Sequence, residues 1–212
     1  MLTVHAADAV HGGPGGDVPA DADAVVVEGS AVLAVGTFRE LTAAHPGARV
    51  RRWSGLITPG LLNAAAPALL EAAYHPDPRE AGELGTEPIT GTALAALGMD
   101  DTRWGAGARR GLQRMLRHGT TAVRGPFTRP AVRTAVARSG LRTYPPGPAA
   151  APALLDPLAA GTGDEVFASG LTAGGPADLA VFGVPDLAAL YAGGAGSCVA
   201  TVLGGRLVFR RG

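Results

Sequence analysis

The sequence contains no lysine, and each of its 18 basic residues is an arginine. A chain without lysine cannot supply a carboxylated lysine that bridges two metal ions. It also cannot form a phosphate-binding loop that ends in Lys-Ser or Lys-Thr. The 18 acidic residues balance the arginines, so the formal net charge is zero. We therefore expect neither a nucleic acid nor a membrane surface as partner, because both attract proteins with a broad positive field.

Cysteine is nearly as scarce, since Cys198 is the only one, and an internal disulfide is excluded. No apolar run approaches the roughly 18 residues that span a bilayer. The start, Met1 to His5, lacks the basic and long apolar parts of a secretory signal. These absences predict a cytoplasmic location. Apolar side chains are abundant instead, at 47% of 212 residues, which is enough for a packed core.

Both ends of the chain show the short apolar runs and glycine turns of β-structure. The N-terminal pattern predicts a strand over residues 2–10, a hairpin of residues 24–28 with 31–36, a helix from Thr37 to about His45, and a strand over residues 49–53. The C-terminal pattern predicts strands over residues 177–182, 197–203 and 206–210, the last two joined across Gly204 and Gly205.

The middle of the chain has helical periodicity. A helix is predicted from about Asp101 to His118, with an apolar stripe opposite its arginines. A strand over residues 120–123, a helix over 130–139 ended by Gly140, and a strand over 141–144 should follow. A run rich in proline and alanine, from Pro145 to Pro157, comes next.

The segment Gly55 to Pro67, GLITPGLLNAAAP, resembles a strand of the amidohydrolase superfamily. In its imidazolonepropionase-like and aminodeoxyfutalosine-deaminase-like members, a similar strand runs into a metal-binding His-x-His pair. Here Ala65 and Pro67 occupy those two places. Residues 170–181 and 199–209 are similar to the closing strands of the same family. The resemblance therefore covers both ends of the chain and the first barrel strand.

The resemblance implies an α/β fold in two parts. Residues 1–54 and 170–212 would form a small composite β-sandwich, and residues 55–169 a (β/α) barrel-like region. A complete barrel takes about 200 to 250 residues, so we expect a truncated one with two or three βα units. Its open edge must be covered either by the helices of residues 61–118 or by a second copy or other protein partner.

The family would hold zinc or iron, but neither Ala65 nor Pro67 offers a donor atom, so we expect no metal cofactor. Asn63, Ala65 and Pro67 either line a metal-free pocket at the strand end or begin a packed helix. A relocated metal site could use His75 with Glu71, Asp77 and possibly His118. The alternative for that charged, proline-rich segment is a solvated loop.

Three other features have a functional and a structural interpretation. The resemblance implies that Asp178 bonds turn amides. Cys198 lies in a predicted buried strand, where a free thiol acts as a small hydrophobic group. Four arginines could form an anion or partner face, or a solvated face paired with Asp100 and Asp101. They are Arg109, Arg110, Arg114 and Arg117.

Two functions follow. The first is a degenerate amidohydrolase-like protein that has lost metal-dependent hydrolysis and binds a small molecule or a partner. The alternative is a hydrolase of non-peptide carbon-nitrogen bonds, in a cyclic amide or amidine, with relocated metal ligands.

Overall fold

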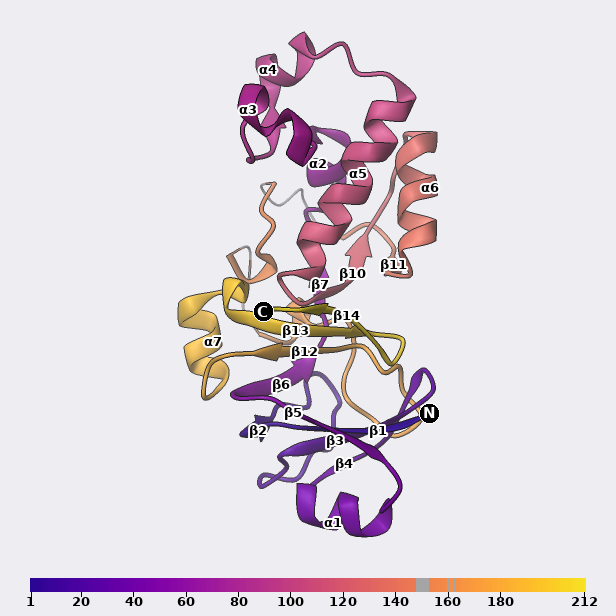
Figure 1. The fold of residues 1–212 in the computed structure, drawn as a ribbon, viewed down its shortest axis with the longest axis vertical. Helices are drawn as coiled ribbons and strands as arrows, with labels where there is room; N and C mark the ends of the chain where they lie inside the picture. Colours follow the sequence, from indigo (N-terminus) through magenta and orange to yellow (C-terminus); the bar gives the residue numbers. More distant parts are fainter. Residues whose placement is uncertain (148–152, 160, 162) are drawn as a thin grey trace.

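The computed structural model describes residues 1–147, 153–159, 161 and 163–212. It is a mixed α/β fold with several sheets, stacked along one long axis (Figure 1). A β-sandwich lies at one end, a short parallel sheet with its helices lies in the middle, and two small helices lie at the other end (Figure 1). No sheet among the described residues closes into a barrel.

The first sheet of the sandwich comes from the N-terminal segment. Its strands, in the order β4-β3-β1-β5, are β4 Ala31–Gly36, β3 Ala24–Glu28, β1 Leu2–Ala6 and β5 Arg49–Arg52. The predicted hairpin of β3 and β4 is confirmed, with Gly29 at φ 58° in the turn. Helix α1, Phe38–Ala44, packs on the outer face of this sheet, and the Thr37 side chain accepts a hydrogen bond from the Glu40 amide at its N-terminus.

The second sheet combines strands from both ends of the chain. Its order is β14-β13-β12-β6-β2, with β14 Arg206–Arg210, β13 Cys198–Leu203, β12 Leu179–Phe182, β6 Leu56–Pro59 and β2 Ala9–Val10. The predicted single strand over residues 2–10 is wrong, because the chain leaves the first sheet after Ala6 and enters the second at Ala9. Valines of β3 pack on β6, β12 and β13 between the sheets.

Gly60 is the point where the chain passes from the sandwich to the parallel sheet. The segment predicted as one strand divides here into β6 and β7, Leu61–Asn63. The sandwich therefore includes residues 56–59, which the sequence analysis assigned to the middle region. A Cβ atom at Gly60 would overlap the Thr121 side chain, so only glycine lets the chain approach the strand that carries Thr121 so closely.

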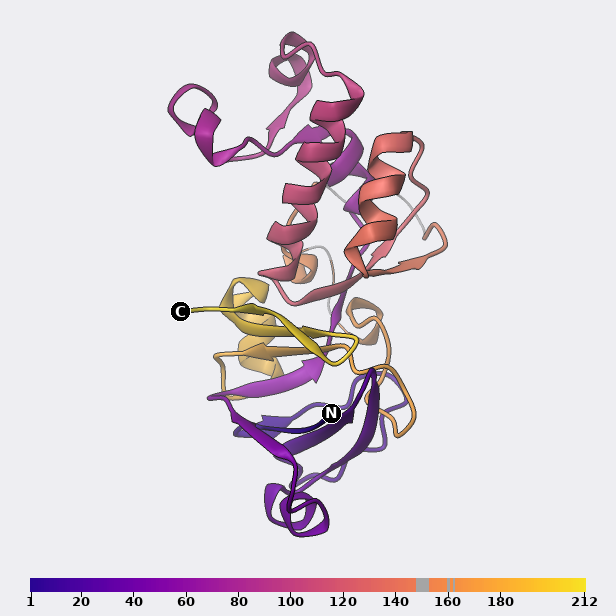
Figure 2. The same ribbon diagram turned by 45° about the vertical axis from the view of Figure 1, so that its right-hand side comes forward.

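The parallel sheet has the order β11-β10-β7, with β10 Thr120–Arg124 and β11 Arg142–Tyr144. Helices α2 Ala66–Glu71, α5 Asp101–Leu116 and α6 Pro130–Ser139 cover one face. The predicted helices over residues 101–118 and 130–139 are thereby confirmed. Leu69, Leu112, Met115, Val123 and Val136 form the centre of this core. In both views α5 and α6 lie side by side (Figures 1 and 2).

The opposite face of the parallel sheet packs against residues further along the chain. Leu62 and Ala122 contact Ala168 there, and Leu61 packs against Leu158 and Phe167. Ala168 also donates its amide to the Gly60 carbonyl at 2.9 Å. The predicted Pro/Ala-rich run reaches this region, but its residues 148–152 lie outside the described part of the chain. Helices of residues 61–118 thus cover only one face, together with α6.

Between α2 and α5 the chain makes an excursion beyond the sheet. It contains β8 Ala73–Tyr74, a 3-10 turn Pro78–Glu80, α3 Ala81–Leu84, β9 Ile89–Thr90 and α4 Gly91–Ala96. In Figure 2 it forms the purple and magenta loops that project at the top. Near the other chain end, α7 Leu187–Gly193 precedes β13. No helix within the described residues is long and apolar enough to cross a membrane.

Candidate functional site

The end of β7 is the place where the resemblance would put the metal. Asn63 is buried, and its side chain is fully used by backbone groups. Its Nδ2 donates to the carbonyls of Leu154 at 3.2 Å and Leu155 at 3.4 Å, and its Oδ1 accepts from the Ala65 amide at 2.9 Å. Asn63 therefore links the end of β7 to the segment that contains Leu154 and Leu155.

Both interpretations of this strand end describe part of what is found. Ala66 begins α2 and Pro67 lies in its first turn, as expected for a packed helix start. Asn63 and Ala65 also line a cavity of about 80 Å³, together with Asp156 and Glu165. This volume is well below the roughly 300 Å³ of a typical metabolite site. The strand end thus offers no room for a metabolite-sized ligand.

The donor atoms at the strand end do not fit zinc or iron. Ala65 is 5% exposed and, like Pro67, carries no side-chain lone pair that could bind a metal. Throughout the described ranges, no three His, Cys, Asp or Glu side chains gather closely enough to hold an ion.

The residues of the relocated site lie in different environments. The Glu71 carboxylate turns to α6, where Oε1 accepts from the amides of Thr128 at 2.7 Å and Arg129 at 2.6 Å. His75 hydrogen-bonds through Nε2 to the Leu69 carbonyl at 2.9 Å. His118 follows α5, and burial lowers its pKa. The structure does not bring Glu71, His75 and His118 together.

The structure separates His75 from the charged residues that follow it, because Arg79 and Glu83 are exposed, as expected of a solvated segment, whereas His75 is buried. His75 is 1% exposed, and burial is the main reason that its pKa falls below the usual 6.5, with Arg114 and Arg110 contributing. Its Nδ1 is buried with no hydrogen-bond partner among the described residues. His75 is therefore neutral near pH 7 and acts as a packed core side chain rather than a solvated one.

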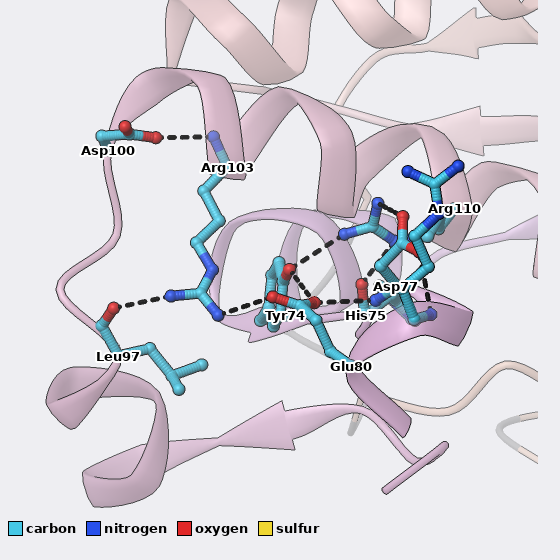
Figure 3. Close-up of polar contacts among 9 residues, drawn as sticks. Tyr74, His75, Asp77, Glu80, Leu97, Asp100, Arg103 and Arg110 are labelled. Atoms are coloured by element: carbon cyan, nitrogen blue, oxygen red, sulfur yellow. Dashed lines mark hydrogen bonds and ion pairs between the residues drawn. The ribbon is translucent and has the colours of Figure 1, made fainter. Parts of the chain in front are cut away.

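A polar network holds the excursion against α5 (Figure 3). The buried Tyr74 hydroxyl donates to Glu80 Oε2 at 2.6 Å and accepts from Arg110 Nη2 at 3.0 Å. Arg103 donates to Glu80 Oε1 at 2.9 Å and to the Leu97 carbonyl at 2.9 Å. The Tyr74 hydrogen bond is the largest cause that lowers the pKa of Glu80. This network fixes one wall of a cleft.

Sequence reasoning missed Tyr74, Glu80 and Arg103 as a unit. A signal was present, because Arg103 and Arg110 are seven residues apart on α5 and so share one helix face. Nothing in the sequence showed that Tyr74 would lie under that face.

The arginines of α5 lie on two sides of the helix. Arg110, Arg114 and Arg117 share the face toward the excursion, whereas Arg109 faces α6 beside Ala135. The expected face of four arginines is corrected accordingly, because neighbouring helix residues point about 100° apart. The expected pairing with Asp100 and Asp101 is also wrong for these arginines. Asp100 instead accepts a hydrogen bond from the Arg103 amide at 2.7 Å as the N-cap of α5.

A cleft of about 390 Å³ lies between this face of α5 and the excursion. Its volume is within the range of small-molecule sites. One wall carries three guanidinium groups and the Gln113 amide, and the other carries Pro76, Pro78 and Ala81 with two carboxylates. The polar side chains that line it are His75, Asp77, Thr86, Glu87, Arg110, Gln113, Arg114 and Arg117. The arrangement suits an anion with a small apolar body.

Asp178 links the sandwich to the parallel sheet. It is 2% exposed, and its Oδ1 accepts from the Gly204 amide at 2.7 Å in the turn between β13 and β14. Its Oδ2 accepts from Arg142 Nε of β11 at 2.6 Å. The turn contact is of the kind that the resemblance implies, and the ion pair with Arg142 adds a second role that the sequence analysis did not include.

A family model for the imidazolonepropionase-like composite domain of bacteria matches residues 24–48, which span β3, β4 and α1. The match supports the resemblance to imidazolonepropionase-like proteins over these residues of the composite domain. The matched residues belong to the sandwich, so the family likeness is firmest at that end of the molecule.

Several solved structures are similar to part of this chain. The ochratoxinase of A. niger has a TM-score of 0.46 and 17% identity over 68% of this chain and 31% of its own. A molinate hydrolase has a TM-score of 0.47 and 20% identity over 68% and 29%. The aminofutalosine deaminase of Helicobacter pylori has 0.43 and 16% over 68% and 33%. The chain therefore matches about a third of the length of these proteins. No curated protein sequence matches it.

Proposed function

We propose that this amidohydrolase-like chain binds a small anionic molecule in the cleft beside α5 and does not carry out metal-dependent hydrolysis. The observation that carries the proposal is the lining of the cleft. Three arginines on successive turns of one helix face a cavity of about 390 Å³, whose other wall carries two prolines, an alanine and the carboxylates of Asp77 and Glu87. All basic residues of this chain are arginines, and guanidinium groups bind carboxylates and phosphates through paired hydrogen bonds.

The strand end supports the same proposal from the other direction. A hydrolytic metal centre needs side-chain donors that hold the ion and polarise its water. Ala65 and Pro67 have none, and the Asn63 amide is spent on backbone carbonyls. Asn63, Ala65 and Pro67 therefore stabilise the fold, and the carboxylates of Asp156 and Glu165 nearby belong to no group of three possible metal ligands among the described residues.

Anion binding can be tested with inorganic phosphate as the probe, by titration followed in ¹H–¹⁵N NMR spectra of the arginine side chains. We expect saturable shifts of the Arg114 and Arg117 signals. Arg117→Gln should weaken binding about tenfold, the loss expected for one charge-assisted hydrogen bond. Arg39→Gln, on the exposed face of α1, is the matched control and should bind like the wild type. Equal affinity in Arg117→Gln and the wild type would refute the proposed site.

The absence of hydrolysis needs its own measurement. We expect protein purified without chelator to contain less than about one tenth of an equivalent of zinc or iron, since the strand end lacks metal donors. The opposite result would be stoichiometric metal together with hydrolysis of a cyclic amide, both lost in His75→Gln. That outcome would favour the hydrolase with relocated ligands.

A further inference from the structure

The charges that line the cleft are unequally satisfied. Arg110 is saturated, because it donates through Nε to the His75 carbonyl at 2.7 Å and also bonds Asp77 and Tyr74. Arg114 contacts a carboxylate, that of Glu87. The Arg117 side chain makes no hydrogen bond or ion pair within the described part of the chain. The cleft therefore offers one uncompensated positive charge.

The contact between Glu87 and Arg114 is the weak member of this set. Glu87 Oε2 lies 3.4 Å from Arg114 Nη2, and the Glu87 side chain is 83% exposed. Arg114 is held in place independently, because its Nη1 donates to the Thr86 carbonyl at 2.7 Å. An exposed pair of this kind contributes little and exchanges easily for another anion. Removing the Glu87 carboxylate would leave Arg114 oriented toward the cleft with a free donor.

Arg114 and Arg117 lie three residues apart on α5 and so are neighbours on its surface. With Glu87 in place, their combined charge toward a ligand is one; with Glu87 displaced, it is two. A dianion can therefore compete for both guanidinium groups, whereas a monoanion gains less from the displacement.

We propose that Glu87 competes with the ligand of the cleft for Arg114 and thereby lowers its affinity. Its carboxylate occupies the outer position on Arg114, and the ligand that replaces it is a dianion, such as a phosphate or a compact dicarboxylate. This inference rests on the proposed anion-binding function, since it assigns the charge of the same ligand. Glu87 then acts as an internal competitor, and its removal raises the affinity for a dianion, which uses both guanidinium groups, more than the affinity for a monoanion.

The test compares two probes, inorganic phosphate and acetate, at about pH 8, where phosphate is mainly a dianion. Binding is followed by NMR at low ionic strength for the wild type, Glu87→Gln and the control Glu83→Gln. Glu83 is exposed on α3 and does not line the cleft. We expect Glu87→Gln to strengthen phosphate binding about threefold and acetate binding less than about twofold, the size expected for release of one surface ion pair. Glu83→Gln should match the wild type for both probes.

Each outcome distinguishes the two proposals. If phosphate binds through Arg117 but Glu87→Gln leaves its affinity unchanged, the role of Glu87 is refuted and the binding site stands. Equal gains for phosphate and acetate would also refute it, because a dianion that uses both guanidinium groups should gain more than a monoanion from the loss of the competing carboxylate. If neither the wild type nor Glu87→Gln binds phosphate, both proposals fail. A shift of the Glu87 amide signal that saturates with phosphate is the expected sign of displacement.

Discussion

Replacing Asp178 tests how the sandwich is fastened to the parallel sheet. Its buried carboxylate makes two charge-assisted hydrogen bonds, with the Gly204 amide and with Arg142. A bond to a charged group contributes about 1.5 to 3 kcal/mol when it is buried. The Arg142 side chain is 44% exposed, so solvent reduces its share to about 1 kcal/mol. We therefore expect Asp178→Ala to lower the free energy of unfolding by about 3 kcal/mol.

Urea unfolding followed by far-ultraviolet circular dichroism measures this loss. Asp178→Asn should lose less, about 1 to 2 kcal/mol, because its Oδ1 can still accept from the Gly204 amide. Asp21→Ala, at an exposed acidic residue with no side-chain bond among the described residues, is the control and should stay within about 0.5 kcal/mol of the wild type. If Asp178→Ala behaves like that control, the two bonds do not fasten the sheets together and the reasoning is wrong.

Two further predictions concern buried side chains of the sandwich. Burial lowers the pKa of His5 from 6.5 to about 4. Between these two pH values the unfolded chain binds a proton at His5 and the native state does not. The contribution to the free energy of unfolding is then fully present above pH 6.5 and falls as the pH drops toward 4, by up to about 3 kcal/mol. Unfolding curves of His5→Gln should show a smaller pH dependence over this range. Burial likewise raises the pKa of the Cys198 thiol to about 11, so an aromatic disulfide reagent at about pH 8 should label it only after denaturant is added. Rapid labelling of the native protein would contradict the buried placement of β13.

Local signals were enough to predict the regular elements. Helix α6 begins at Pro130 and ends before Gly140, which has a φ of 80°, because proline suits the first turn of a helix and glycine suits the left-handed conformation after its last residue. The β3 and β4 hairpin followed from its valines and its glycine turn for similar reasons. Each of these elements depends mainly on residues within its own segment.

What the sequence could not show are the places that depend on distant contacts. The chain passes from β6 to β7 at Gly60, where a Cβ atom would overlap Thr121, a residue about 60 positions further along the chain. The burial of His75 also depends on a distant segment. Its proline and charged neighbours indicate an exposed position, but the helix face that carries Arg110, 35 residues later in the sequence, covers it. The cleft also forms between segments that are distant in the sequence. The sequence therefore identified its arginines but not which of them face the same side of the helix.

The strand order of the second sheet has a consequence for how the protein is made. β6 pairs on one side with β12, which is encoded about 120 residues later. While synthesis proceeds, the edge of β6 that later pairs with β12 is unpaired, and the valines of β3 lack the side chains of β12 and β13 that oppose them in the finished fold. A chain that ended before Leu179 would therefore have an incomplete sandwich with an exposed apolar face. Chaperones retain and proteases remove products of this kind.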